Sequence, residues 1–442
     1  MKVLFVGALA GFYARDDATV EKLAKNPTVT EIVVIGGNAR TALLPKVRNI
    51  PSPNGGRWTL QEIVLVAIQE TVDFAVVGAD EPLGDGLVDM LEEADVRTFG
   101  PNKEAAQLEA SKSKAIEWMR EAGIPHAESR IFTDQTKALE FARTCAIPIV
   151  AKIDCFAEGK GVKICTTKEK AIAAVAGFIR NYPGKPIIFQ ELLLGVEVSV
   201  FCFTDGTDIS EVVAACDYKP RSENDRGPNT GSMGSFSPPQ FWSDRLAEWV
   251  KRTILLPIVE IMGRKGILYR GVIYAGLMLT ADGPKVLEFN CRLGDSEGQV
   301  ILLLLETDLL DIMLACRAGT LNQTPVVWNR QLVAGTVVLV DEDYPESVGN
   351  NGGHIDGLDQ VGEGVIVFHY GTKLVECADG SRYVVLGGSG RRLSVTAVGA
   401  THEEVFERIY RAAQKISFPG KNWRADIGKG RDLPEDLQLI YT

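Results

Sequence analysis

Short apolar segments alternate with amphipathic segments along the first hundred residues of the chain. Apolar runs of four or five residues, each close to a glycine, are typical of strands buried in a parallel sheet. The segments between them repeat their apolar positions with helical spacing. The expected strands are residues 2–6, 31–35 and 73–77, and the expected helices include residues 16–25 and 59–70. This pattern predicts an N-terminal domain built on an open α/β sheet.

The middle and last parts of the chain follow different patterns. After the breaker Gly100-Pro101, residues 103–122 predict one long amphipathic helix that ends at Gly123. From about residue 325 the chain becomes rich in strands, with one late helix at residues 402–416. The expected central elements are strands 147–153, 162–165 and 186–191, a helix at 168–180, and strands 271–279 and 285–291 joined by a turn at Asp282-Gly283.

A chain of 442 residues is too long for one ordinary domain, and its length suggests about three. The changes of pattern place the domains at residues 1–103, 104–325 and 326–442. The expected fold class is α/β, and α+β in parts. An open α/β sheet domain comes first and a β-rich domain comes last.

The composition is that of a soluble globular protein, with 45% hydrophobic and 24% charged residues and a mean hydropathy of +0.04. No apolar run reaches the roughly 18–20 residues that span a bilayer, so no membrane partner is expected. A signal peptide is the alternative interpretation of the first residues, but their alternation into a glycine turn favours a buried strand. The net charge of −11 argues against nucleic-acid binding, while one small phosphorylated ligand could be held by local cations.

The eight cysteines include no C-x-x-C pair, which argues against both a disulfide framework and a zinc site. A reducing cytoplasm is therefore the expected compartment. The four histidines lie outside the segments that carry phosphate or metal chemistry, so none is assigned a catalytic role.

A glycine-rich loop, AEGKGV at residues 157–162, lies between two expected strands. Backbone N–H groups of such a loop can contact phosphate oxygens, and Lys160 adds a positive charge. The Walker A motif is excluded, because valine rather than Ser or Thr follows Gly161. Taken alone, the segment is equally well explained as a plain hairpin turn.

The segment KVLEFNCRLGD at residues 285–295 combines a strand pattern with metal-ligand chemistry. On a strand, Glu288, Asn290 and Arg292 project from one face, while the intervening residues, Leu287 among them, pack on the other. Two oxygen ligands two residues apart suit Mg²⁺, which completes its octahedron with phosphate and water. Arg292 could pair with a phosphate. The alternative is an ordinary solvent-facing strand face.

Two further segments carry polar groups that a nucleotide could use. The loop at residues 217–236 is rich in glycine and cations, and ordering it is costly unless it serves a ligand. Residues 189–199 (FQELLLGVEVS) place carboxylates at a strand end, where they could bind an adenine edge and a ribose diol. A mobile surface loop and ordinary strand-end carboxylates are the alternatives. Taken together, the four segments follow the order of an ATP-grasp core.

The chain resembles the phosphoribosylamine–glycine ligase (glycinamide ribonucleotide synthetase) family of the ATP-grasp superfamily over nearly its whole length. The motif GPNTGSMG at residues 227–234 is the most specific match to the family's GPNTGGMG. The other matching segments are FGPNKEAAQLE at 99–109, YAGLM at 274–278, LEFNCRLGD at 287–295, FHYGT at 368–372 and DIG at 426–428.

The resemblance implies an ATP-dependent carbon–nitrogen ligase of purine biosynthesis, with ATP and Mg²⁺ (or Mn²⁺) as cofactors. Glycine and 5-phosphoribosylamine would be joined through an acyl phosphate, giving glycinamide ribonucleotide, ADP and phosphate. The first domain would bind the acceptor, and the second would be an ATP-grasp domain with a mobile flap at about residues 125–192. The third would complete the cleft. The family resemblance implies a monomer or a homodimer.

The resemblance also implies roles for individual residues. Those expected to bind ATP are Lys112, Lys152, Glu158, Gly159, Lys160, Gly161, Glu191, Leu192, Glu197, Asn229, Thr230 and Gly231. Those expected to bind the metal are Glu288 and Asn290. The residues expected to line the acceptor side as catalytic groups are Asp217, Lys219 and Arg292.

The acceptor side departs further from the family pattern than the ATP side. The family opens with a glycine-rich turn followed by Arg-Glu-His-Ala, whereas residues 7–15 are GALAGFYAR, without that histidine or the paired glycines. One alternative is therefore a relative that ligates a different amino acid or amine acceptor. A non-catalytic nucleotide-binding protein is a third interpretation, against which the retained Glu288 and Asn290 speak.

Overall fold

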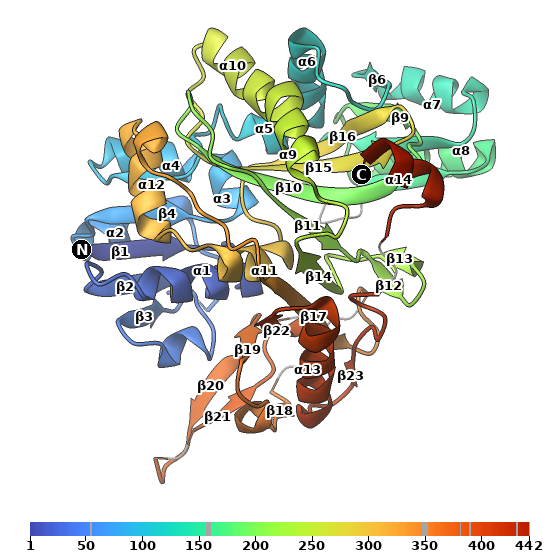
Figure 1. Cartoon of the computed structure of the whole chain (residues 1–442). Helices are drawn as coiled ribbons and strands as arrows, with labels where there is room; N and C mark the ends of the chain where they lie inside the picture. The colour runs from blue at the N-terminus through green and yellow to red at the C-terminus, as the bar shows by residue number, and fades with distance from the viewer. Residues whose placement is uncertain are drawn as a thin grey trace.

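The computed structural model describes residues 1–53, 55–155, 161–346, 352–380, 382–388, 390–429 and 432–441. One large central sheet connects three regions (Figure 1). They are the N-terminal sheet (residues 2–99), an upper lobe (residues 107–290) and a lower lobe (residues 333–429). Among the described residues, no helix is both long enough and apolar enough to cross a membrane.

The N-terminal sheet is parallel throughout, in the order β3-β2-β1-β4-β5. Its strands are β1 (Lys2–Val6), β2 (Glu31–Ile35), β3 (Val47–Ile50), β4 (Phe74–Val77) and β5 (Thr98–Phe99). Its helices are α1 (Ala14–Ala24), α2 (Leu60–Gln69), α3 (Asp80–Asp85) and α4 (Leu87–Glu93). Strands β1, β2 and β4 are buried on both faces, which explains their continuous apolar runs. The expected open α/β sheet is confirmed.

The strand order reverses between β1 and β4, the two strands that lie side by side at the centre of this sheet. Ligands of open α/β sheets bind where the order reverses, beyond the carboxyl ends of the strands. Gly7 follows β1 and Gly78 follows β4, so the chain places small residues at this position. The fold alone therefore points to a binding site at this edge.

The single helix expected at residues 103–122 is wrong. Two helices occupy this stretch, α5 (Gln107–Ala110) and α6 (Lys112–Ala122), and Ser111 between them is extended, with φ −129° and ψ 106°. The Ser111 hydroxyl accepts a hydrogen bond from Lys114 N and donates one to Asp154 Oδ2, 3.2 Å away. Serine competes well for N-cap positions, and the partner at Asp154 is distant in sequence, which the local pattern does not reveal.

A small antiparallel sheet in the upper lobe has the order β6-β9-β7-β8. Its elements are β6 (Ser129–Phe132), β7 (Ile149–Ile153), β8 (Val162–Cys165), β9 (Ile187–Glu191), α7 (Gln135–Thr144) and α8 (Lys168–Asn181). The two helices pack on it around a hydrophobic core separate from that of the rest of the chain. The mobility of this unit stays a prediction, and residues 156–160 of its glycine loop lie outside the described residues.

One nine-stranded sheet runs through the central and last parts of the chain, in the order β16-β15-β10-β11-β14-β17-β22-β19, with β23 beside β17. Its strands are β10 (Val196–Thr204), β11 (Val213–Asp217), β14 (Gly234–Ser237), β15 (Gly271–Thr280), β16 (Gly283–Asn290), β17 (Val333–Asp341), β19 (Val365–His369), β22 (Arg391–Gly399) and β23 (Lys421–Asn422). The expected hairpin at Asp282-Gly283 joins β15 to β16, and the β-rich last part is confirmed. Antiparallel pairing of β14 with β17 makes the two parts continuous.

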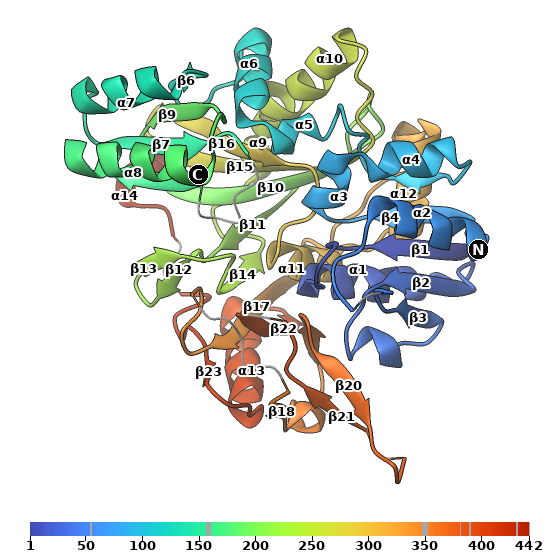
Figure 2. The ribbon, with the colours of Figure 1, turned by 180° about the vertical axis from the view of Figure 1, so that it is seen from behind.

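The remaining elements cover this sheet or extend from it. They are α9 (Asp244–Val250), α10 (Leu256–Arg264), α11 (Glu297–Leu304), α12 (Leu309–Ala318), α13 (His402–Lys415), α14 (Glu435–Tyr441), β12 (Pro220–Ser222), β13 (Arg226–Asn229), β18 (His354–Ile355), β20 (Lys373–Glu376) and β21 (Arg382–Val385). Helix α11 packs against α1 as well as β14 and β17, so it joins the N-terminal sheet to the large sheet. Helix α14 lies at the upper part of the molecule, away from the elements of the lower lobe that precede it in the chain (Figures 1 and 2).

Candidate active site

A polar cavity of about 320 Å³ opens where β10 and β11 come together. Its lining comes from both strands, from the loop after β11 and from the C-terminal segment. The lining residues are Gly195, Val196, Glu197, Asp217, Lys219, Pro220, Asp225, Asn229, Met278 and Asp432. Four residues expected at the nucleotide and acceptor sites, Glu197, Asp217, Lys219 and Asn229, therefore share one cavity.

Lys219 and Glu197 form an ion pair at the wall of this cavity. Burial alone would lower the pKa of Lys219, but Glu197, Tyr274 and Glu288 hold it well above its ordinary value. The ammonium group is therefore charged at neutral pH and available to an anionic ligand.

Lys152, on β7 of the small sheet, is a second cation of the site, and its side chain is buried. Its Nζ donates to the carbonyl oxygen of Leu287 at 3.3 Å. Burial lowers the pKa of Lys152 to about 8, and Lys112 and Lys219 act in the same direction against Glu288. The three lysines thus lie close enough to influence one another, as expected of groups that share one polyphosphate.

The contact between Lys152 and Leu287 depends on an irregularity in β16. Gly276 pairs with Glu288, but its neighbour Leu277 pairs with Val286, so Leu287 is an extra residue on this strand. The expected packing of Leu287 on the apolar face is therefore wrong, because a bulge interrupts the alternation there. The bulge turns a backbone carbonyl toward Lys152 and leaves the positions from Glu288 onward as expected.

Glu288 and Asn290 have the chemistry of a magnesium site. Burial would raise the pKa of Glu288, but Lys219, Lys152 and Lys112 keep it below its ordinary value, so the carboxylate is ionised. Asn290 Oδ1 accepts a hydrogen bond from Arg292 at 3.0 Å, and its buried Nδ2 has no acceptor within the described part of the chain. No group of three or more Asp, Glu, His or Cys among the described residues could hold a metal. A carboxylate and an amide oxygen fit Mg²⁺ that takes its other ligands from phosphate and water.

Arg292 is held by a carboxylate that the sequence analysis did not single out. Its Nη2 lies 2.9 Å from Glu109 Oε1, and Glu109 Oε2 accepts the backbone N–H of Cys291 at 2.7 Å. Burial raises the pKa of Glu109, and Arg292 opposes that rise. Glu109 ends the matching segment 99–109, which is the signal that could have identified it. It fixes the guanidinium at the end of β16.

A second cavity, of about 30 Å³, lies at the reversal point of the N-terminal sheet. Arg15, Asp16, Gly78 and Arg292 are among its lining residues. Arg15 is buried, and its Nε has no hydrogen-bond acceptor among the described residues, with Asp16 Oδ1 3.6 Å away. Burial raises the pKa of Asp16 to about 7. Residues 7–15 stand out in the sequence only as a departure from the family pattern, so Arg15 was missed as a candidate anion ligand.

Asp217 lines the larger cavity, and the buried carboxylate Glu297 lies close to it. Burial and the neighbouring Glu297 raise the pKa of Asp217 well above its ordinary value. Glu297 Oε1 accepts hydrogen bonds from Ser199 at 2.9 Å and from Tyr274 at 3.0 Å. These contacts fix the start of α11 to the sheet floor. Glu297 was missed, although it lies two residues beyond the segment 287–295.

The remaining expected ATP ligands lie at the edges of the site. Glu191, followed by Leu192, ends β9; its Oε1 lies 3.1 Å from Lys285 Nζ. Thr230 donates its hydroxyl to the Lys219 carbonyl at 2.7 Å, which shapes the cavity wall. Gly161 accepts from Ile153 N at 2.9 Å. Glu158, Gly159 and Lys160 lie outside the described residues, so their role stays a prediction.

Gly231 is bound to the lower lobe. Its N–H donates to the hydroxyl of Tyr344 at 2.8 Å, and its carbonyl accepts from Arg391 at 2.9 Å. Arg391 also lies 3.0 Å from Asp295 and over the rings of Tyr370 and Tyr13, 4.9 and 5.7 Å from their centroids. The half-buried Arg391 guanidinium therefore links the loop at residues 227–234, through Gly231, to Tyr370 of the lower lobe and to Tyr13 of the N-terminal domain.

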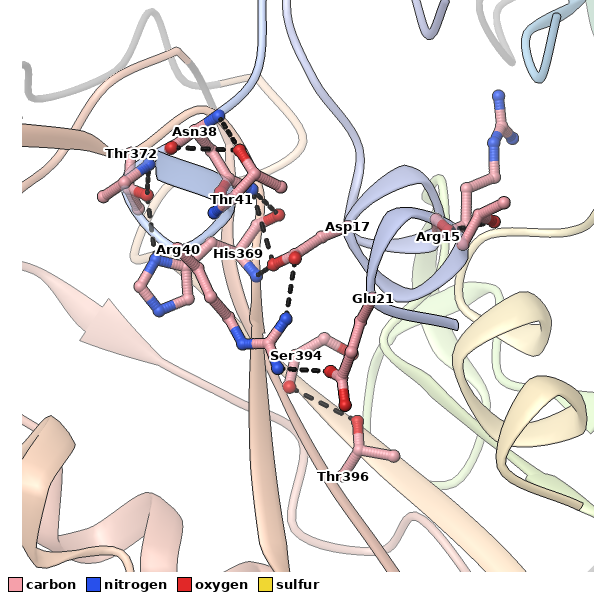
Figure 3. A network of polar contacts seen from close by, with 12 residues as sticks. Arg15, Asp17, Glu21, Asn38, Arg40, Thr41, His369, Thr372, Ser394 and Thr396 are labelled. Carbon is pink, nitrogen blue, oxygen red and sulfur yellow. Dashed lines mark hydrogen bonds and ion pairs between the residues drawn. The ribbon is translucent and has the colours of Figure 1, made fainter. Parts of the chain in front are cut away.

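A polar network joins the first helix to the lower lobe at some distance from the cavities (Figure 3). Asp17 on α1 is fully buried; its Oδ1 accepts from Arg40 at 2.8 Å and its Oδ2 from the backbone N–H of His369 at 2.8 Å. Asn38 Nδ2 donates to the His369 carbonyl at 2.8 Å. Burial lowers the pKa of His369 to about 3, so its ring is neutral and structural. The network sets the position of α1, which carries Arg15 and Asp16.

Three family models match the chain in succession. They describe the N domain, the ATP-grasp (A) domain and the C domain of phosphoribosylglycinamide synthetase, and they match residues 1–109, 110–298 and 334–430.

Similar proteins of known name agree with these matches. The chain is 37% identical over 433 residues to the phosphoribosylamine–glycine ligase of Nostoc, which covers 97% of this chain and 99% of that protein. It is 39% identical over 434 residues to the trifunctional purine biosynthetic protein adenosine-3 of Gallus gallus, covering 97% of this chain but only 42% of that longer protein. The crystal structure of the phosphoribosylamine–glycine ligase of Thermotoga maritima superposes with a TM-score of 0.81 at 29% identity, covering 97% of this chain and all of the other.

Proposed function

The chain belongs to the phosphoribosylglycinamide synthetase family, and we propose that it joins the carboxylate of glycine to the amine of 5-phosphoribosylamine, coupled to the conversion of ATP to ADP and phosphate. The full-length relationship carries the assignment of the reaction. The clustering of Lys152, Lys219, Glu288 and Arg292 supports the site in which it takes place.

In the first step an oxygen of the glycine carboxylate attacks the γ-phosphorus of ATP. The bond from that phosphorus to the β–γ bridging oxygen breaks, and ADP leaves with the electron pair. Charge on the transferring group is stabilised by positioned cations, and the buried Lys152 and the half-buried Lys219 are cations of the site. Lys112, whose Nζ donates to the Cys155 carbonyl at 3.1 Å, lies near Lys152.

Magnesium, bound by Glu288 and Asn290, would neutralise charge on the phosphates. The chain supplies an ionised carboxylate for it, because the surrounding lysines keep the pKa of Glu288 low despite burial. Arg292 keeps Asn290 oriented through the 3.0 Å hydrogen bond to its oxygen.

In the second step the amine nitrogen of the acceptor attacks the carbonyl carbon of the acyl phosphate. The bond from that carbon to the phosphate oxygen breaks, phosphate leaves, and the nitrogen loses a proton. Arg15 and Arg292, which line the smaller cavity, would bind the anionic acceptor on this side. Enclosure between the lobes would protect the acyl phosphate from water.

ADP release with glycine and freshly generated phosphoribosylamine tests the proposal. We expect turnover that needs both substrates and Mg²⁺. Turnover with other acid–amine pairs but none with this pair would replace the proposal by a ligase of different acceptor specificity. ATP binding without turnover on any pair would instead indicate a non-catalytic nucleotide-binding protein.

We also keep residues 1–103, 104–325 and 326–442 as the proposed domains, and a cytoplasmic location. The start of α5 and α6 beyond residue 103 and the start of β17 at Val333 support the domain boundaries. All eight cysteines are free thiols, which supports a reducing compartment.

A further inference from the structure

Two parts of the C-terminal segment contact the surroundings of the larger cavity. The first part, Arg424 and Asp426, binds the polar loop that follows β11. Arg424 is buried; its Nη1 donates to the Pro220 carbonyl at 3.0 Å, and its Nη2 lies 2.9 Å from Asp225. Asp426 Oδ2 accepts the N–H of Asn224 at 2.9 Å. Pro220 and Asp225 both line the cavity, so this part of the lower lobe fixes one of its walls.

The second part is helix α14, which packs on the upper lobe. Leu433, Leu437 and Tyr441 are buried, and their spacing of four residues places them on one face of the segment. The Tyr441 hydroxyl donates to the carbonyl of Thr280 at 2.6 Å, at the end of β15. Met278, two residues earlier on that strand, lines the cavity. The helix is therefore anchored next to the cavity floor.

Asp432, just before this helix, is itself one of the residues that line the cavity. The segment 432–441 lies beyond the C-domain match, which ends at residue 430. The last matching sequence segment, DIG at 426–428, also ends before it. The segment 432–441 is thus a part of the site that neither the motifs nor the family match identifies.

The charge of the cavity lining indicates which end of a nucleotide lies beside Asp432. Glu197, Asp217, Asp225 and Asp432 are acidic, and Lys219 is the one cation among the described lining residues. Carboxylates repel a triphosphate but accept hydrogen bonds from hydroxyl and amino groups. The phosphates belong instead toward Lys152 and Lys112, where cations gather.

We propose that residues 432–441 form a wall of the nucleotide pocket, with Asp432 accepting a hydrogen bond from the nucleoside part of ATP and α14 holding it there. The inference rests on the proposed function, since it needs the larger cavity to be the ATP site. Leu437 and Tyr441 act as positioning residues: both are buried, neither lines the cavity, and Tyr441 is hydrogen-bonded to Thr280 at the end of β15.

Isothermal titration calorimetry of the whole chain with MgADP measures whether residues 432–441 contribute to nucleotide binding. Asp432→Ala should raise the Kd for ADP about fivefold, and Leu437→Asp, which puts a charge on the buried face of α14, about tenfold. Asp436→Ala is the matched control, because Asp436 is an exposed aspartate of the same helix that does not line the cavity, and its Kd should equal that of the wild type. Inorganic tripolyphosphate lacks the nucleoside. Its inhibition of ligase turnover should therefore stay unchanged in all three variants.

Hydrogen exchange of the peptide 433–441 gives a second readout that does not depend on the variants folding well. MgADP should slow exchange there in the wild-type protein, and glycine should not. Unchanged Kd values for ADP in both Asp432→Ala and Leu437→Asp would overturn the inference, and so would tighter binding, which would show that the helix competes with nucleotide. Intact ADP binding without ligase turnover in the same preparation would contradict the proposed function alone.

Discussion

Replacing Arg40 by alanine tests whether the buried network between α1 and the lower lobe stabilises the fold. Arg40 bridges Asp17 and Glu21, and Asp17 has no exposed side-chain surface. The change leaves the Asp17 carboxylate buried without its cation. Arg48 offers a matched control, because it also bridges two carboxylates, Glu31 and Glu70, but its side chain is 46% exposed.

The expected magnitude follows from burial. Removing one partner of a buried ion pair costs about 3–5 kcal/mol. Because Asp17 Oδ2 keeps the backbone N–H of His369 at 2.8 Å, we expect the lower end, about 3 kcal/mol in the free energy of unfolding. For Arg48→Ala the expected loss is about 0–1 kcal/mol, since exposed pairs are screened by water.

The pH dependence has a definite sign. Burial raises the pKa of Asp17 even with Arg40 present. Without Arg40 that pKa should rise further above its value in the unfolded chain. A group of this kind favours the folded state at low pH and ceases to do so as pH rises through its folded pKa. The loss caused by Arg40→Ala should therefore be larger at pH 8 than at pH 5.

Urea denaturation at both pH values, followed by circular dichroism, measures the stability loss. Hydrogen exchange of the α1 peptide shows whether the loss is local to the network, which matters because a chain with several lobes need not unfold in one step. Equal losses for the two arginine variants would refute the reasoning from burial. A larger loss at pH 5 than at pH 8 would refute the assigned charge state of Asp17.

Three further predictions concern the active site. Glu288→Gln should abolish Mg²⁺-dependent ADP release while leaving the circular dichroism spectrum unchanged, and near wild-type kcat would remove Glu288 from the metal site. Because burial lowers the pKa of Lys152 to about 8, its charge is lost as pH rises through that value; affinity for ADP, measured by titration, should fall above pH 8, and Lys152→Arg should not show the fall. Arg15→Ala should raise the KM for phosphoribosylamine at least about tenfold without changing the KM for ATP, because Arg15 lines the smaller cavity only; a rise in both would place it on the nucleotide side.

The sequence was sufficient to predict the elements in which neighbouring residues share the same degree of burial. Strands β1 and β2 were located to the residue, because a strand buried on both faces must be apolar throughout. The β15–β16 hairpin was likewise fixed by its turn residues. Glu288, Asn290 and Lys219 could be predicted as site residues because they lie within short motifs.

Tertiary structure decided the features that depend on distant partners. The break at Ser111 depends on Asp154, and the burial of Asp17 depends on Arg40 and His369. The bulge at Leu287 depends on pairing with β15. Glu109 forms its ion pair with Arg292 only because α5 packs against the end of β16. The return of α14 to the cavity has no local signal, since the spacing of Leu433, Leu437 and Tyr441 predicts an apolar face but not the surface that covers it. Local periodicity records how much of a residue is buried, whereas the identity of its partner is set by the packing of segments far apart in sequence.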